Sequence, residues 1–178
     1  MPKATKAEPI ALVIDRIPTP IGELLIIADD KGALRAIDWH DHEVRLLQLL
    51  GRYCGKAGYT LTPRRNPGGL SVALRAYFKG DLGIIDGLKV DTGGTDFQHA
   101  VWRQLRRIPC GKTIAYAELA RRIDKPKAVR AVGLANGSNP ISIVVPCHRV
   151  IGSDGSLTGY GGGLHRKQWL LEHERAIG

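Results

Sequence analysis

The chain has 178 residues, of which 43% are hydrophobic and 24% are charged. These proportions are those of ordinary globular proteins and exclude a disordered tail protein or a fibrous repeat. No stretch of the sequence reaches the ~20 apolar residues that a membrane-spanning helix needs, and the opening residues lack the apolar core of a secretory signal. We therefore expect a folded, cytoplasmic protein that does not associate with a membrane.

Basic residues outnumber acidic residues by 26 to 17, which gives a formal net charge of +9. The excess is greatest over residues 103–130, where nine Lys and Arg residues accompany only Glu118 and Asp124. This concentration favours a polyanion as partner, although a basic surface that merely keeps the protein in solution would give the same overall charge. The three cysteines and six histidines show no metal-binding spacing, so we expect no metal and no other cofactor.

The first half of the chain is expected to form an α/β unit. Short apolar, β-branched runs predict three strands, at residues 10–14, 23–28 and 33–39. The Asp and Gly residues between the last two runs are typical of a hairpin turn. Asp41 is expected to cap a leucine-rich helix, and a second helix is expected over residues 70–79. We find no catalytic group of residues in this half.

The second half begins after a Gly-rich boundary and has helical periodicity. Thr95 and Gln98 match a capping box at the start of a helix that runs to about residue 107. Two shorter helices are expected around a tight turn, at residues 116–123 and 127–136. Pro126 suits the first position of the second of these helices, because its fixed φ angle is already helical. This outline is that of a helix-turn-helix, whose second helix carries small side chains that would let its backbone approach a groove.

The residues that favour catalysis follow an apolar run at residues 141–145, which predicts a buried strand. The strand is expected to break at Pro146, so that Cys147 and His148 lie where it leaves the core. Neighbouring groups are expected to lower the pKa of the Cys147 thiol and so increase its nucleophilic thiolate form. Adjacent residues are poorly placed for a direct hydrogen bond, and His148 could instead take the proton through a water, oriented by a carboxylate near residue 174. Cys54 and Cys110 are interpreted as structural.

Three segments together resemble the signature of the O6-alkylguanine-DNA alkyltransferases: GSNP at 137–140, PCHRV at 146–150 and GYGGG at 159–163. The preceding half resembles the N-terminal domain of the bacterial stand-alone form. The resemblance implies an α+β fold, with a small ribonuclease-H-like α/β domain at residues 1–90. A mostly helical catalytic domain that contains the helix-turn-helix would follow at residues 91–178.

The same resemblance implies a DNA repair enzyme, a methylated-DNA–protein-cysteine S-methyltransferase. Its partner would be double-stranded DNA that contains O6-alkylguanine or O4-alkylthymine. The damaged nucleotide would be flipped out through the minor groove, and its alkyl group would pass irreversibly to the protein, once per molecule. The protein would be a monomer that can cluster on DNA.

Roles for individual residues also follow from the resemblance. Cys147 would accept the alkyl group, His148 would act as its base through a water, and Glu174 would orient His148. Tyr116 would contact the flipped base, and Arg130 would fill the gap that the base leaves. The residues expected to contact substrate or DNA are Tyr116, Arg130, Ala131, Gly133, Asn139, Val150, Tyr160 and Gly161.

Asn139 would organise the hinge before the active-site strand, and the carbonyls of Cys147 and Val150 and the Gly161 N–H would read the guanine. Vertebrate members of the family carry serine where this chain has Gly161. We expect the missing side chain to widen the pocket for alkyl groups larger than methyl.

Two other classes of protein fit part of the pattern. A cysteine hydrolase could use Cys147 and His148, but such enzymes usually bring their nucleophile and base together from distant parts of the chain. A non-catalytic DNA-binding module of the same fold would bind lesions without repair. Proteins of that kind usually carry tryptophan in place of the acceptor cysteine, so Cys147 argues against this reading.

Overall fold

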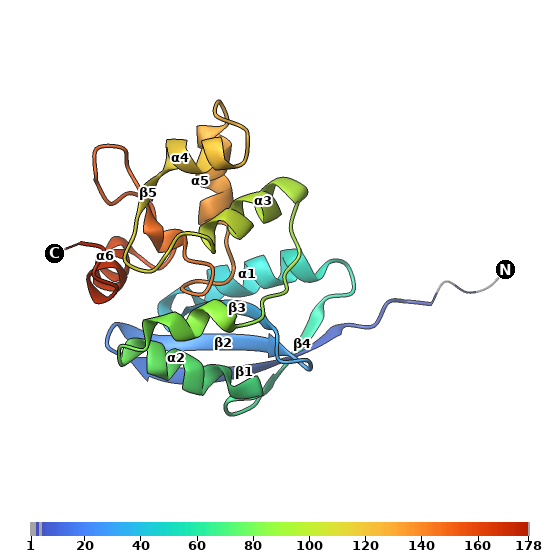
Figure 1. Cartoon of the computed structure of the whole chain (residues 1–178). Helices are drawn as coiled ribbons and strands as arrows, with labels where there is room; N and C mark the ends of the chain where they lie inside the picture. The colour runs from blue at the N-terminus through green and yellow to red at the C-terminus, as the bar shows by residue number, and fades with distance from the viewer. Residues whose placement is uncertain (1–2, 4, 178) are drawn as a thin grey trace.

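The structure is a computed structural model that describes residue 3 and residues 5–177. Its N-terminal half contains a four-stranded sheet (Figure 1). Its strands are β1 (Ile10–Thr19), β2 (Gly22–Asp29), β3 (Leu34–Trp39) and β4 (Tyr59–Pro63). The order across the sheet is β3-β2-β1-β4. β2 is antiparallel to both β1 and β3, and β4 runs parallel to β1.

Helices cover both faces of this sheet (Figure 1). Successive side chains of β2 point to opposite faces, so Ile27 packs under α1 (Glu43–Cys54) and Ile26 packs on the other face, in the core that α2 (Leu70–Phe78) covers. Burial on both faces explains the continuous apolar run of β2 in the sequence.

The second half is mostly helical, as the sequence predicts. Its helices are α3 (Asp96–Leu105), α4 (Tyr116–Arg122), α5 (Val129–Gly137) and α6 (Leu164–His173). A short parallel pair, β5 (Ile114–Ala115) with β6 (Val150–Ile151), lies among them. The described residues also form four 3-10 helices: η1 (His40–His42), η2 (Pro67–Gly69), η3 (Leu82–Gly87) and η4 (Cys147–Arg149). The described part contains no helix of the length and apolarity that a bilayer crossing requires.

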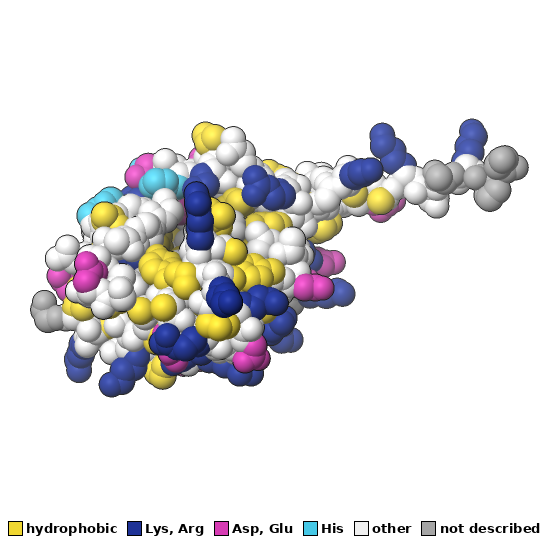
Figure 2. All heavy atoms as spheres, turned by 90° about the horizontal axis from the view of Figure 1, so that it is seen from above, with side chains coloured by type: hydrophobic (Ala, Val, Ile, Leu, Met, Phe, Trp, Pro, Cys, Tyr) yellow, Lys and Arg dark blue, Asp and Glu magenta, His cyan; other side chains and the backbone are white. Residues whose placement is uncertain are grey.

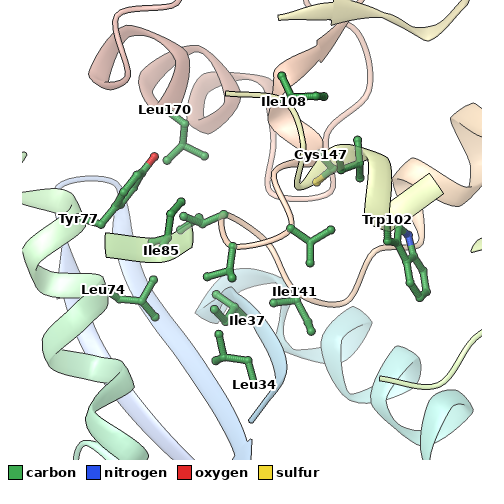
Figure 3. Packing of buried hydrophobic residues seen from close by; sticks show 14 of the residues in the cluster. Leu34, Ile37, Leu74, Tyr77, Ile85, Trp102, Ile108, Ile141, Cys147 and Leu170 are labelled. Carbon is green, nitrogen blue, oxygen red and sulfur yellow. The ribbon is translucent and has the colours of Figure 1, made fainter. Parts of the chain in front are cut away.

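The free edge of β3 joins the two halves. The Ile37 N–H donates to the Pro140 carbonyl (2.9 Å), and the Ile37 carbonyl accepts from the Ser142 N–H (3.1 Å). Figure 3 shows Ile37 and Ile141 together in the core, with Cys147 in the same cluster. An edge strand offers unpaired backbone groups, and here the segment that leads to Cys147 satisfies them.

That segment is not the strand that the sequence predicts. Residues 141–145 form a buried turn with a single bridge to β3, and Ile143 has a φ of 72°, which is rare for a β-branched residue. The prediction was wrong because a short apolar run signals burial without distinguishing a strand from a buried turn.

The predicted first residues of two helices were also wrong. Asp41 does not cap α1, because its carboxylate accepts a hydrogen bond from Arg166 (2.8 Å), and α1 begins after His42 without a side-chain cap. Pro126 is not the first residue of α5, because the turn continues to Ala128. The strand β4 was missed, since it is short, contains Pro63 and is largely exposed.

The capping box at the start of α3 is confirmed. The Thr95 hydroxyl accepts from the Gln98 N–H (3.1 Å), and the Gln98 side chain accepts from the Thr95 N–H (2.9 Å). We expect Thr95→Ala to lower the free energy of unfolding by about 1 kcal/mol, because a backbone donor loses its partner. Urea denaturation measures this loss. Thr95→Ser keeps the oxygen and is the control, and an equal loss in both variants would contradict the capping role.

Candidate active site

Cys147 begins the 3-10 helix η4, directly after the buried turn, and is 6% exposed. The side chain of Asn139 holds this turn from inside. Its amide nitrogen donates to the carbonyls of Val145 (2.8 Å) and Ile141 (3.3 Å), and its oxygen accepts from the Ile141 N–H (2.9 Å). These bonds fix the bend that brings the thiol to the edge of the core.

The thiol is not activated by its resting surroundings. Burial raises the pKa of Cys147, although the Asn139 amide and the charges of Lys167 and Arg45 act in the opposite direction. The expectation of a lowered pKa was therefore wrong, because loss of hydration penalises the thiolate more than these neighbours favour it. At neutral pH the thiol is protonated, and its reaction requires a base.

A buried carboxylate lies behind the thiol. Glu174 accepts hydrogen bonds from His148 Nε2 (2.9 Å), from Arg149 Nε and Nη2 (3.0 Å each) and from the Tyr77 hydroxyl (2.7 Å). Burial opposes its charge, but His148 and Arg149 hold the pKa of Glu174 well below its usual range. Arg149 in turn donates to the Ile108 carbonyl (2.6 Å). Glu174 is thus a fixed anion that faces the imidazole.

His148 is a neutral base in this arrangement. Burial lowers the pKa of the imidazole, and the opposing effect of Glu174 does not reverse the shift. An ionised carboxylate can only accept, so the proton of neutral His148 lies on Nε2, and Nδ1 carries the lone pair. Nδ1 is buried and has no hydrogen-bond partner among residue 3 and residues 5–177. The side chains of His148 and Cys147, which are both described, form no hydrogen bond with each other. This agrees with their adjacency in the chain.

Lys167, on α6, holds the loop at residues 152–163 to the segment that follows η4. Its buried ammonium donates to the carbonyls of Val150 (2.6 Å) and Thr158 (2.8 Å), and burial lowers its pKa to about 8. The Tyr116 hydroxyl donates to the same Thr158 carbonyl (3.3 Å). Tyr160 packs edge-on against Trp39, with 6.2 Å between ring centroids. Tyr116, Val150 and Tyr160 are thus brought around one loop.

A hollow of about 10 Å³ lies at the thiol, with room for about one water. Its lining includes Cys147, Asn139, Tyr160 and Gly161 from the second half, and Arg45 from α1. No sequence pattern points to Arg45, because it lies about 100 residues before Cys147, in a helix without a catalytic pattern. Lys167, Arg149 and Tyr77 were also missed as partners in the site.

The helix-turn-helix, α4 and α5, lies at the end of the molecule that Figure 2 views from above. On that face, hydrophobic side chains lie together near the centre with Lys and Arg side chains around them (Figure 2). Arg130 and Ala131 are exposed on α5, and Gly133 faces the Tyr116 ring. Glu118 pairs with two of the basic side chains of α4, so the charge of this surface is partly compensated.

The other two cysteines are also free thiols. Cys54 and Cys110 are half-buried, and burial raises the pKa of each. In the part of the chain that the structure describes, no three His, Cys, Asp or Glu side chains are grouped so that they could hold a metal ion.

Comparison with known proteins gives consistent matches over most of the chain. The ribonuclease-like domain of 6-O-methylguanine DNA methyltransferase matches residues 12–92, and its DNA binding domain matches residues 96–176. A methylated-DNA–protein-cysteine methyltransferase of Shigella flexneri is 54% identical over 165 residues, 93% of this chain and 96% of that protein. One from Methanosarcina barkeri is 45% identical and covers 90% and 95%. A crystal structure of Mycobacterium tuberculosis OGT in complex with DNA has a TM-score of 0.74 at 40% identity, over 94% of each chain.

The fold and the buried thiol beside a helix-turn-helix define a class of DNA-binding proteins with a reactive cysteine. The chain belongs to the 6-O-methylguanine DNA methyltransferase family. The resemblance drawn from the sequence is confirmed, and so is the α+β fold with a ribonuclease-like first half. The roles of single residues stay predictions.

Buried His148 predicts a pH dependence of stability. Burial lowers its pKa in the folded protein below the ordinary 6.5, so the unfolded chain binds a proton first as the pH falls. We expect the free energy of unfolding to decrease below about pH 6.5, by up to ~1.4 kcal/mol per pH unit from this group. Above that pH the group is neutral in both states and contributes no slope.

Urea denaturation between about pH 5 and 7 tests this dependence in the parent, in His148→Asn and in His165→Asn. His148→Asn removes the buried imidazole and should have a shallower slope. The exposed His165 on α6 provides the matched control, and its replacement should keep the parent slope. Identical slopes in the parent and His148→Asn would contradict the prediction.

Proposed function

We propose that this chain repairs O6-alkylguanine in duplex DNA by transferring the alkyl group to Cys147, once per protein molecule. The observation that carries the proposal is the buried hydrogen bond between His148 and Glu174 (2.9 Å), at the residue that follows Cys147 in a chain of this family. The family resemblance extends the substrate range to O4-alkylthymine.

In the proposed reaction, His148 Nδ1 takes the thiol proton through a bridging water, and Glu174 stabilises the resulting imidazolium. The Cys147 sulfur then forms a bond to the alkyl carbon. The bond from that carbon to O6 breaks, and its electron pair goes to the guanine. The proton that the thiol loses is the one that guanine needs to become neutral, so no cofactor is required. The thioether is not hydrolysed by water, and the protein is consumed.

The O6 atom faces its pairing partner inside the duplex, so the nucleotide must leave the stack, which costs a few kcal/mol. We propose that α5 enters the minor groove, that Arg130 fills the vacated space, and that Tyr116 contacts the flipped base. Ala131 and Gly133 would let the α5 backbone approach the groove. Asn139, Val150, Tyr160 and Gly161 would surround the base. The protein would act as a monomer with domains at residues 1–90 and 91–178.

Intact-mass measurement after incubation with an O6-methylguanine oligonucleotide tests the transfer. We expect the protein mass to increase by one CH₂ group, located by peptide mapping on Cys147. Cys147→Ser should show no increase but nearly unchanged DNA affinity, because affinity comes mostly from phosphate contacts.

Cys54→Ser and Cys110→Ser are the matched controls and should still be alkylated. Methylation of Cys54 or Cys110 in place of Cys147 would overturn the assignment of the acceptor. Release of many products per protein molecule would instead favour a hydrolase. An unchanged mass with retained binding to the lesion would favour the non-catalytic module.

The role of Arg130 is tested by comparing duplex DNA with free O6-benzylguanine. We expect Arg130→Ala to slow repair of the duplex about tenfold or more, because the flipped-out state of the base would lose ~1.4 kcal/mol or more of stabilisation. Reaction with the free base should be nearly unchanged, because nothing needs to be held out. Arg121→Ala, on α4, is the control for loss of positive charge alone. If both substrates slowed equally in Arg130→Ala, the extrusion role would be wrong.

A further inference from the structure

Gly161 does not leave an open space in the pocket wall. A Cβ atom built on Gly161 would lie 2.7 Å from the Arg45 Cζ and 2.9 and 3.0 Å from its two terminal nitrogens. Such distances are too short for non-bonded atoms, so the guanidinium of Arg45 occupies the place that a side chain at position 161 would need. The expectation that glycine by itself widens the pocket is therefore wrong.

Arg45 is held in this place from two sides. Its Nη1 pairs with the carboxylate of Asp38 (2.8 Å), a fully buried residue of β3. Its Nη2 donates to the carbonyl of Gly137, the last residue of α5. The guanidinium thus spans from the N-terminal sheet to the end of the second helix of the helix-turn-helix. A side chain anchored in this way resists displacement more than a free surface arginine.

The same guanidinium borders the hollow at the Cys147 thiol, which holds about one water. A flipped base must enlarge this hollow, and a base with a bulky alkyl group must enlarge it further. Arg45 is the long side chain that the N-terminal half contributes to the lining, and it lies against the loop residue that the base would approach.

We propose that Arg45 is a specificity-determining residue, whose guanidinium fills the space beside Gly161 and limits the size of the alkyl group that reaches Cys147. Positions 45 and 161 are then coupled: the long side chain at one requires glycine at the other. This inference rests on the proposed transfer to Cys147 and adds the element that sets its substrate range.

Single-turnover rates with O6-methylguanine and O6-benzylguanine in the same oligonucleotide test the proposal. The ratio of the two rates cancels effects on DNA affinity that both lesions share. We expect Arg45→Ala to raise the benzyl-to-methyl ratio by about tenfold or more, the lower end of what a pocket discriminates for one methylene group. Arg45→Lys keeps a long side chain whose charge can still pair with Asp38, and should leave the ratio near that of the parent.

The coupling is tested by adding Gly161→Ser. In the parent this substitution should lower both rates, because the serine would push the guanidinium of Arg45 away from position 161 and into the hollow at the thiol. In Arg45→Ala the same serine should have a much smaller effect. Thermal unfolding verifies that each variant is folded, and Asp38→Asn combined with Arg45→Ala removes the buried unpaired charge and should give the same ratio as Arg45→Ala alone.

An unchanged ratio in folded Arg45→Ala would overturn the proposal, and so would an equal rise in Arg45→Lys or equal effects of Gly161→Ser in both backgrounds. These results leave the transfer itself intact, because the parent would still alkylate Cys147. A parent that forms no adduct on Cys147 would overturn the proposed function and this inference together.

Discussion

The buried carboxylate of Glu174 is the constraint on which the site depends. A charge at 2% exposure is tolerated only when its lone pairs are occupied, and here four donor groups from three side chains occupy them. Removal of one partner from such a cluster typically costs ~3–5 kcal/mol, because the remaining charge stays buried. These donors come from α2 and η4, while Glu174 follows α6. One ion therefore holds together the C-terminal helix, the 3-10 helix that contains Cys147 and the helix that covers the sheet. The orientation of His148 is a consequence of that packing.

The N-terminal half contributes to the site as well as to the core. The edge of β3 hydrogen-bonds the segment before Cys147, and Asp38 on the same strand anchors Arg45 at the hollow. Arg166 of α6 lies over the Trp39 ring, 5.0 Å from its centroid. The sheet therefore supports the cysteine turn, one wall of the pocket and the C-terminal helix. A change within β3 would therefore alter the surroundings of the thiol, although the strand carries no reacting group.

The sequence was sufficient for features that depend on local patterns. The capping box of α3, the apolar run of β2 and the motif around Cys147 are each encoded within a few residues, and the first two form the elements that were expected. Features that depend on distant contacts were not predictable in the same way. Asp41 has the chemistry of a helix cap, but Arg166, 125 residues later, takes its carboxylate. The direction of the Cys147 pKa shift was predicted wrongly, because the sequence shows the residues next to Cys147 but not how deeply the thiol is buried.

Burial of the thiol is consistent with a protein that reacts once. A neutral, nearly inaccessible thiol reacts slowly with electrophiles and oxidants in solution, because the thiolate is the nucleophile and exposure sets its rate. The proposed base, His148, is in place at rest, but the hollow beside Cys147 admits no more than about one water. Reaction then requires a ligand that opens the hollow and places its carbon against the sulfur. The free energy for that opening must come from binding elsewhere on the ligand, and in the proposed reaction a duplex docked along α5 would supply it through its phosphate contacts. Poor intrinsic activation of the thiol and the proposed selectivity for damaged DNA are thus two consequences of the same packing.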